Sequence, residues 1–256
     1  MLKGLYTAYS GMINEQHRMD TLSNNLANSA TTGYKKEGST SQSFDTLLTL
    51  KIKDTSEYKN GAKPIGLANP GVKIGENYTN YDQGGFRETG NTYDLALSGD
   101  GFFSIEFQNK AGEVSTKYTR DGSFTLNKEG FLVTKDGDYV LGENGRIQLD
   151  PLRDASIDTQ GRIIQEGTIQ QLLISDFEDY NYLKHYGENY YEPVEGAKFI
   201  NSNAAVNSGF LEMSNVQVVS EMVEMISVTR AYESNQKIIQ AYDQSLDIAV
   251  NRLGKL

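Results

Sequence analysis

The sequence predicts an α+β fold in which long N- and C-terminal helices form a coiled-coil-like stem around an inserted antiparallel all-β domain. At both ends of the 256-residue chain, apolar residues recur in alternating steps of three and four, the spacing of a coiled-coil seam. Between the ends the period falls to two, and Asp-Gly or Glu-Gly pairs separate short β-rich runs. We therefore divide the chain into an N-terminal stem helix (1–36), an extended arm or linker (37–83), a β domain (84–208) and a C-terminal stem helix (209–256).

The N-terminal helix is expected over residues 1–29. Tyr6, Ile13 and Leu22 widen its apolar face, which predicts contacts with more than one neighbour. Gly33 is expected to take a left-handed turn after the helix stops. The predicted seam of this helix consists of Leu2, Leu5, Tyr9, Met12, Gln16, Met19, Ser23 and Leu26.

The C-terminal helix is expected over residues 213–253. A second apolar row, Val219, Val223 and Ile226, lies beside its seam. Polar seam residues cost stability but restrict register and partner choice, so an isolated two-stranded zipper is a poor description. We interpret both seams as assembly surfaces. The C-terminal seam consists of Val218, Met222, Met225, Thr229, Tyr232, Gln236, Ile239, Asp243, Leu246, Val250 and Leu253.

The middle of the chain carries the β signal. The turn pairs Asp121-Gly122, Glu129-Gly130 and Asp136-Gly137 are expected to supply the positive φ that tight hairpins require. Before them, residues 37–83 are rich in Ser, Thr, Lys, Asn and Gly around two short apolar patches. This composition predicts an extended arm that pairs with the sheet or with a neighbouring subunit.

Composition excludes several classes of function. The formal net charge is −10, and an acidic middle segment is a poor surface for nucleic acid, which needs clustered Lys and Arg. The chain has no cysteine, so disulfides, thiolate catalysis and Cys-ligated zinc are ruled out. The start of the sequence lacks the apolar run of a cleaved signal peptide, and no segment is apolar enough to predict a membrane span.

Four stretches of the sequence carry a family signature. Residues 22–35 resemble the Asn-Asn-Leu-Ala-Asn signature of bacterial flagellar axial proteins, and residues 93–103, 118–124 and 209–233 resemble motifs of the flagellar basal-body rod protein family. Within that family the distal rod protein is favoured over its proximal-rod relative. The motif residues are Asn24, Asn25, Leu26, Ala27, Asn28, Gly33, Asp100, Gly101, Phe102, Arg120, Asp121, Gly122, Ser214, Asn215 and Val216.

The resemblance implies a structural subunit of the rod, a self-assembling tubular drive shaft that transmits torque. It further implies that the paired terminal helices line the tube around the export channel while the β domain faces outward. Implied partners are copies of the chain, other rod proteins, the hook protein and the flagellar type III export apparatus, together with a contact to peptidoglycan. The implied location is the basal body outside the cytoplasmic membrane, reached without a cleaved signal peptide.

No residue pattern requires catalysis, a cofactor or a metal. His17 and His185 are the only histidines, so one chain offers no multi-histidine metal site. Met222 and Met225 are better interpreted as adaptable packing than as a metal-binding row. The aspartates beside glycines, such as Asp100, fit turn chemistry.

Two alternatives to the rod interpretation stay open at this point. The first is a cell-envelope module that binds a glycan by stacking on a tyrosine cluster in the β domain. The second is an acid/base hydrolase that uses Asp94 or Asp121. The cluster consists of Tyr180, Tyr182, Tyr186, Tyr190 and Tyr191.

Overall fold

The computed structural model describes residues 2–52, 62–109, 112–187 and 189–253. The chain forms two compact units, each assembled from segments far apart in the sequence. The first unit contains residues 1–26, 37–79 and 218–256, and the second contains residues 27–36 and 80–217. The predicted α+β class is confirmed, because a helix stands near each end of the chain and antiparallel strands fill the middle.

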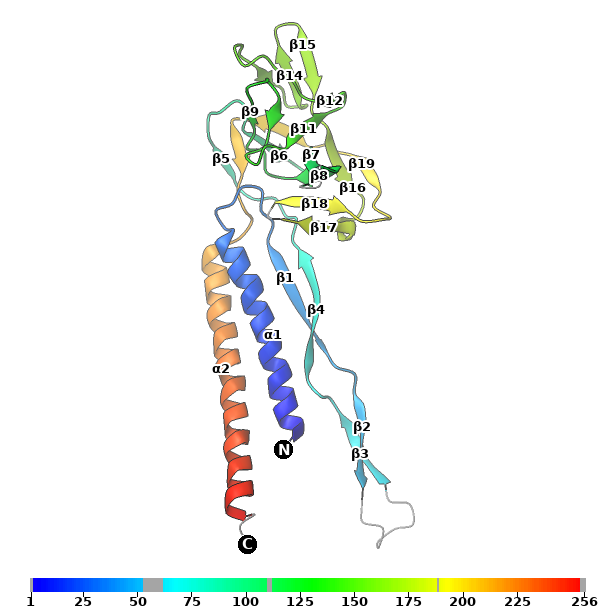
Figure 1. Ribbon diagram of the computed structural model, residues 1–256, viewed down its shortest axis with the longest axis vertical. Helices are drawn as coiled ribbons and strands as arrows, with labels where there is room; N and C mark the ends of the chain where they lie inside the picture. Colours follow the sequence, from blue (N-terminus) through cyan, green and yellow to red (C-terminus); the bar gives the residue numbers. More distant parts are fainter. Residues whose placement is uncertain (1, 53–61, 110–111, 188, 254–256) are drawn as a thin grey trace. The chain divides into compact units, whose positions relative to one another are not determined.

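The two helices of the first unit run antiparallel (Figure 1). They are α1 (Leu2–Ala27) and α2 (Val218–Ile248), and α2 continues into a π-helical turn, η2 (Ala249–Leu253). At 1.5 Å per residue they are about 39 and 46 Å long. The second helix begins at Val218, later than residue 213, where it was predicted. Residues 213–217 form a connecting segment instead, in which the side chains of Ser214 and Asn215 bond to the backbone. Over its described residues, neither helix is long and apolar enough to cross a membrane.

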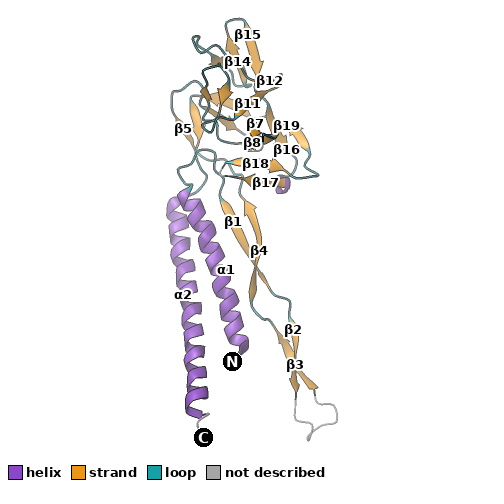
Figure 2. Ribbon diagram, in the orientation of Figure 1, coloured by secondary structure: helices purple, strands orange, loops and turns teal. Residues whose placement is uncertain are grey.

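The arm of the first unit pairs with itself, so the expected pairing with the main sheet is wrong for its described residues. It consists of two antiparallel ribbons, drawn in orange beside the purple helices in Figure 2. A bulge interrupts each ribbon, at Ser39–Ser41 in one and at Thr49–Leu50 in the other. The first ribbon joins β1 (Glu37–Ser43) to β4 (Val72–Thr79), and the second joins β2 (Leu47–Ile52) to β3 (Ala62–Ala68).

The second unit is built on one large antiparallel sheet. Among the described residues, ten strands form it, with a central path in the order β17-β18-β8-β7-β11-β10-β9. The strands on this path are β7 (Phe102–Gln108), β8 (Val114–Thr119), β9 (Thr125–Leu126), β10 (Leu132–Val133), β11 (Tyr139–Gly142), β17 (Leu183–Tyr186) and β18 (Tyr190–Pro193). Three further strands join at its side, namely β12 (Gly145–Arg146), β16 (Ile174–Phe177) and β19 (Phe199–Asn201).

Smaller pairings complete the second unit. The strands β13 (Ser156–Ile157), β14 (Arg162–Gln165) and β15 (Thr168–Gln171) form a three-stranded sheet. Two isolated ribbons join β6 (Leu95–Ser98) to β20 (Ala205–Ser208) and β5 (Phe86–Glu88) to β21 (Phe210–Glu212). A short 3₁₀ helix, η1 (Tyr180–Tyr182), precedes β17. Since β21 lies just before α2 in sequence, the C-terminal segment contributes to both units.

The hydrophobic core lies in the second unit, as two clusters of side chains. Aliphatic residues and two rings in edge-to-face contact, Phe103 and Phe124, form the larger cluster. The smaller cluster is aromatic and is centred on Phe102, whose ring contacts Phe177 and Tyr191. Phe102 and Phe103 are consecutive residues of β7 and point to opposite faces, so the two clusters bury both faces of this strand.

The predicted glycine turns are confirmed at Gly130 and Gly137, whose φ angles are 83° and 94°. Gly122 differs, because it is absent from the left-handed positions of the described backbone. A larger residue does not fit at position 122, because a Cβ there would overlap the carbonyl oxygen of Leu95. The Asp-Gly pair there thus allows close packing of two segments rather than a left-handed turn.

Candidate assembly interface

The contact between α1 and α2 follows every seventh residue of α1. A Cβ at Gly4 would overlap the hydroxyl of Tyr242, and one at Gly11 would lie 3.0 Å from Nδ2 of Asn235. Small residues at these positions therefore let the two helices approach closely. The next positions along α1 are polar: Arg18 donates to Glu224 at 3.0 Å, and Asn25 donates to Glu221 at 3.3 Å. Polar pairs of this kind fix the register of two helices, as buried polar residues do in coiled coils.

The helix faces that touch within the subunit differ by one position from the predicted seams. In α2 the buried residues Glu221 and Val228 form one row with Asn235 and Tyr242. The predicted row lies one position later in sequence and begins at Met222. The other predicted row is half-buried: Met225, Tyr232, Ile239 and Leu246. In the row that Glu221 and its companions replace, Thr229 is half-buried, while Met222, Gln236, Asp243 and Val250 are exposed. Val218, which begins the other predicted row, is exposed as well.

The predicted seam of α1 likewise lies one position away from the face that meets α2. Tyr9 and Gln16 are exposed, and Leu5, Met12, Met19 and Leu26 are half-buried. The side chains of Leu2 and Leu253 lie outside the described part of the structure. The predicted seam residues remain candidates for contacts between subunits.

The arm contacts another face of α1. Asn14 donates to Ser41 at 2.9 Å, and His17 Nε2 lies 3.0 Å from Asn77 Oδ1. Asn25 then joins the end of the helix to the start of β1, because its amide exchanges two hydrogen bonds with the backbone of Glu37, at 2.7 and 2.9 Å. Asn25 thus contacts both β1 and α2. His17 packs against β4 of the arm.

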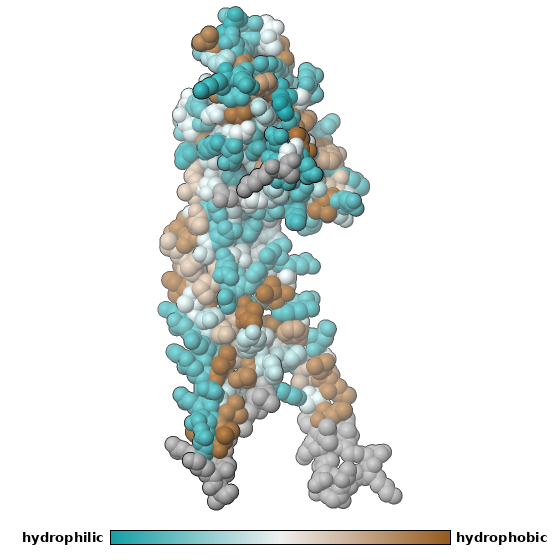
Figure 3. Space-filling model, in the orientation of Figure 1, coloured by the Kyte–Doolittle hydropathy of each residue, from teal (hydrophilic) through white to brown (hydrophobic). Residues whose placement is uncertain are grey.

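Large hydrophobic side chains remain uncovered on the first unit. They gather over the first turns of α2 and near β2 and β3 (Figure 3). Contiguous apolar surface of this kind marks an interaction site in a protein that folds in water. The exposed side chains include Tyr6, Tyr9, Ile13, Phe44, Leu47, Leu48, Leu67, Val219, Met222, Val223 and Ile226.

The family-motif stretches meet at one place in the second unit, which we name the motif junction. Gly33 has a φ of 70° and donates its backbone N–H to the carbonyl oxygen of Glu212 at 2.8 Å. A Cβ on Gly33 would overlap the backbone of Asp121. Thr32 donates to the Asp121 carboxylate at 2.8 Å. The left-handed turn predicted for Gly33 is confirmed, and it lies six residues beyond the end of α1.

A buried ion cluster forms the centre of the motif junction. Lys35 Nζ lies 2.6 Å from one Glu212 carboxylate oxygen, and Arg120 lies 3.5 Å from the other. Lys35 also donates to the carbonyl oxygen of Asp82 at 2.9 Å. Burial lowers the pKa of Lys35, and the Glu212 carboxylate opposes this shift. Because all three charged side chains are buried, each depends on the others for compensation.

The residues just before α2 are hydrogen-bonded at the same junction. Asn215 accepts from the backbone N–H of Lys36 at 2.7 Å and donates to the carbonyl oxygens of Asn80 and Asp82. Ser214 accepts from the backbone N–H of Val216, which is buried. Three segments distant in sequence are therefore held together before α2 begins.

The remaining motif residues have structural places as well. Phe102 is fully buried, and the Arg120 guanidinium lies 5.2 Å from the centre of its ring. Asp100 is exposed and accepts from Ser202 through its carbonyl oxygen, beside Gly101 with a φ of 139°. Asn28 accepts from Thr31 at 3.2 Å, which stabilises the turn after α1. Asn24 and Ala27 are exposed.

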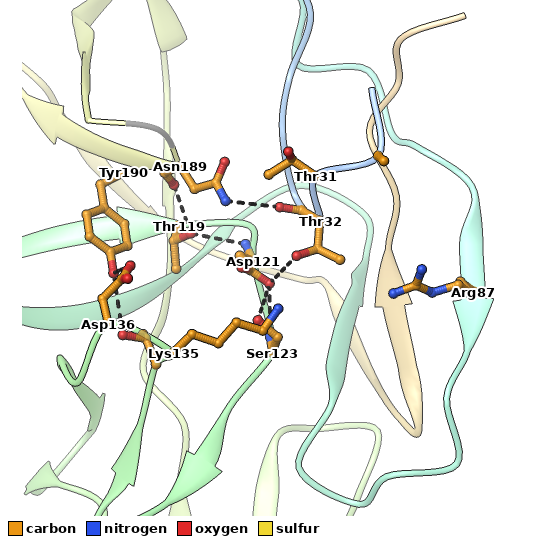
Figure 4. A pocket seen from close by; sticks show the side chains of 12 residues that line it. Thr31, Thr32, Arg87, Thr119, Asp121, Ser123, Lys135, Asp136, Asn189 and Tyr190 are labelled. Atoms are coloured by element: carbon orange, nitrogen blue, oxygen red, sulfur yellow. Dashed lines mark hydrogen bonds between the residues drawn. The ribbon is translucent and has the colours of Figure 1, made fainter. Parts of the chain in front are cut away.

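A polar pocket of about 310 Å³ lies next to the motif junction (Figure 4). The Asp121 carboxylate accepts from Thr32 and from Ser123 Oγ at 2.7 Å, so this carboxylate holds a turn. Asn189 donates to the carbonyl oxygen of Thr32. No histidine is among the lining residues that the structure describes, and Ser123 therefore has no imidazole base to activate it.

The tyrosine cluster and the aspartates give no support to the alternative functions. Tyr191 is buried, and Tyr180 packs against Tyr81 while donating to Asp176 at 2.7 Å. Tyr190 donates to Asp138, and burial raises its pKa. Tyr182 and Tyr186 keep exposed faces. Asp94 pairs through its backbone with Ser123. Among the described residues, no group of three His, Asp or Glu side chains is placed to hold a metal.

Sequence reasoning missed two residues at the centre of the site. Lys35 and Glu212 lie inside the motif stretches, but neither was singled out, because a lone charged residue in a polar stretch gives no sign of burial. The one signal was the position of Glu212 between the apolar Leu211 and Met213. Gly4, Ala8 and Gly11 were missed as well, since small residues contribute little to a hydrophobic pattern.

An antiparallel helix pair with open apolar faces, in a chain that also carries an antiparallel β domain, is typical of a structural subunit that packs with other subunits. Three family models match the chain in order: flagella basal body rod protein at residues 5–35, flagellar hook protein FlgE/F/G D1 domain at 96–170, and flagellar basal body rod FlgEFG protein C-terminal at 207–253. The chain belongs to the flagellar basal-body rod protein family, and its role is that of a structural rod subunit.

Relatives match over the full length. The flagellar basal-body rod protein FlgG of Bacillus subtilis (strain 168) is 36% identical, with 98% of this chain and 99% of that protein covered. The flagellar basal-body rod protein FlgF of Caulobacter vibrioides is 34% identical, and the flagellar hook-basal body complex protein FlhO of Bacillus subtilis is 32% identical, each with 100% of both chains covered. These relatives are named as basal-body components, which agrees with the prediction that the chain is not an enzyme.

Proposed function

We propose that copies of this chain assemble into the tubular part of the rod, which transmits torque and surrounds the export channel. The observation that carries the proposal is that both helices of the first unit keep an exposed apolar face after they have packed on each other. Laterally packed helices distribute load over many small contacts, each weak by itself. Such a tube resists twisting through the number of contacts rather than through any single strong one.

In this proposal the segments have separate tasks. Residues 1–36 and 209–256 form the stem, in which the predicted seam residues make coiled-coil-like contacts with several neighbouring helices. Residues 37–83 act as an arm along the stem, and residues 84–208 form the β domain that faces outward. The half-buried row Met225, Tyr232, Ile239 and Leu246 supports this division, because its side chains are only partly covered within the subunit.

Assembly with other flagellar basal-body components follows from the family, and we propose the finer partners. They are other rod proteins, the hook protein and the export apparatus, with peptidoglycan touching the outer surface. The chain is proposed to reach the outer side of the cytoplasmic membrane through the export apparatus, without a cleaved signal peptide. We further propose a distal position in the rod, on the sequence resemblance to distal rod proteins.

Substitutions in the half-buried row test the assembly proposal. Met225→Asp and Leu246→Asp each place a charge in the predicted seam, where a packed neighbour would leave it without solvent. We expect both variants to be missing from purified basal bodies and the cells to be non-motile. Lys128→Asp, on an exposed turn of the β domain, is the control that should leave rods intact.

Two outcomes would overturn the proposal. Normal motility in both seam variants would show that the row is not an assembly surface. Electron microscopy of basal bodies from a deletion strain addresses position: loss of the distal rod and hook supports a distal subunit, whereas complete basal bodies would exclude a rod function.

A further inference from the structure

An apolar groove lies between α1 and the arm of the first unit. It encloses about 490 Å³. Tyr6 and Tyr9 are 64% and 51% exposed, although both are large aromatic residues. We define the groove by Tyr6, Tyr9 and Ile13 of α1 together with Phe44, Val72 and Ile74 of the arm.

A second apolar face, which we name the stripe, lies on the first turns of α2. It consists of Val219, Met222, Val223 and Ile226, and Val219 and Val223 are 76% and 63% exposed. Their spacing of three, four and seven residues places them on one side of the helix. Within the described part of the subunit, these side chains remain open to solvent.

Helical geometry puts the groove and the stripe on opposite sides of the helix pair. Each residue advances an α-helix by about 100°. Tyr6 and Ile13 follow Gly4 and Gly11, which face α2, by two residues, and so they point about 200° away from α2. On α2, the stripe residue Val219 precedes the buried Glu221 by two residues and points away from α1 in the same manner.

From this arrangement we infer that the stripe of one copy packs into the groove of a second copy. The inference rests on the proposed rod function and names the two surfaces that meet. The groove residues Tyr6 to Ile13 and the stripe residues Val219 to Ile226 each span one seven-residue step, about 10 Å of helix, so the two apolar faces match in length.

The groove and the stripe are different surfaces on opposite sides of the helix pair, and this arrangement favours a second copy of the chain as the partner. A symmetric dimer pairs the same surface twice, and would cover either the groove or the stripe while leaving the other exposed. Pairing groove with stripe covers both faces on every interior copy, and it repeats from one subunit to the next. A contact of this head-to-tail kind generates rings or helical filaments, as a rod requires.

Disulfide trapping tests the pairing cleanly, because the chain contains no cysteine. A Tyr9→Cys/Val223→Cys double variant is expressed in place of the natural chain, and basal bodies are purified under mild oxidation. Since the two positions face opposite ways within one copy, a disulfide between them joins neighbouring copies. We expect a ladder of cross-linked multimers from the double variant and monomers from either single variant.

The control replaces the stripe position with an exposed residue outside both faces. Ile169 in β15 is 65% exposed, so Tyr9→Cys/Ile169→Cys tests for random collision and should give no ladder. Dimers from a single variant would reveal symmetric contacts and overturn the inference. Incorporation of the double variant into basal bodies without a ladder would also overturn it, while the rod function would stand. Absence of the natural chain from basal bodies would overturn both.

Discussion

Lys35 Nζ lies 2.6 Å from Glu212 Oε1, with both side chains buried. Arg120 is buried on the other oxygen of the same carboxylate, so one anion compensates two cations. This carboxylate holds the segment after α1, the loop containing Asp82 and the strand before α2 in a single cluster. Removing its charge therefore affects three segments together.

We expect Glu212→Gln to lower the free energy of unfolding by about 3 to 5 kcal/mol, because Lys35 and Arg120 would stay buried without a counter-ion. Chemical denaturation of the purified chain measures the loss. Glu178→Gln is the matched control, since Glu178 pairs with Lys198 at 3.0 Å on the surface, where such a pair contributes at most about 1 kcal/mol. Similar losses in the two variants would contradict the role assigned to Glu212.

Gly33→Ala separates steric overlap from backbone strain. Gly33 and Gly137 both have a left-handed φ, but only Gly33 has backbone atoms of another segment where a Cβ would stand. At Gly137 the same substitution meets open space and is expected to cost about 1 to 2 kcal/mol. The loss at Gly33 should exceed that value because Asp121 must move. Equal losses would indicate that the segments slide apart at little cost.

The sequence indicated the helices, the β domain and the family motifs, but not which helix faces touch within one subunit. In α2 the predicted row Met225, Tyr232, Ile239 and Leu246 is half-buried within the subunit. The buried row contains Glu221, one position before the predicted seam residue Met222. A search for regularly spaced apolar residues identifies Met222 as a buried position and passes over Glu221, because Glu221 is charged. The structure buries Glu221 beside Asn25, where a hydrogen bond compensates the polar group.

The same reasoning explains why the sequence did not identify the residues of α1 that face α2, or the buried charges of the motif junction. Gly4 and Gly11 face α2 because they are small, and the large residues Tyr6 and Tyr9 are left outside. An apolar pattern records burial against all partners, including other copies, so it does not distinguish contacts within the subunit from contacts between subunits. Lys35 and Glu212 are 177 residues apart, and only the folded chain shows that they meet.

Asp138 gives a prediction about pH. Burial raises the pKa of its carboxyl above the ordinary 3.8, against the hydrogen bond from Tyr190, which lowers it. A raised carboxyl pKa contributes stability that is present below the ordinary value and is lost as pH rises through the folded-state value. We therefore expect the free energy of unfolding of the natural chain, relative to Asp138→Asn, to fall as the pH rises above the ordinary carboxyl pKa of 3.8. A difference that stays constant as the pH rises would contradict the assignment.

The last prediction concerns α1 and α2 in a dilute monomer. α1 packs against α2 on one face and against the arm on another, but Tyr6 and Tyr9 are more than half exposed and the stripe residues of α2 face solvent. Most helical stability in proteins comes from tertiary packing rather than from intrinsic propensity. The amides of both helices should therefore exchange with deuterium faster than those of Phe103 and Ile105 in the core strand β7. In assembled rods, where neighbours would cover the open faces, the same helix amides should become protected. Strong protection of both helices already in the dilute monomer would contradict this, because it would show that the contact through Gly4, Gly11 and Asn25 is sufficient to hold the pair.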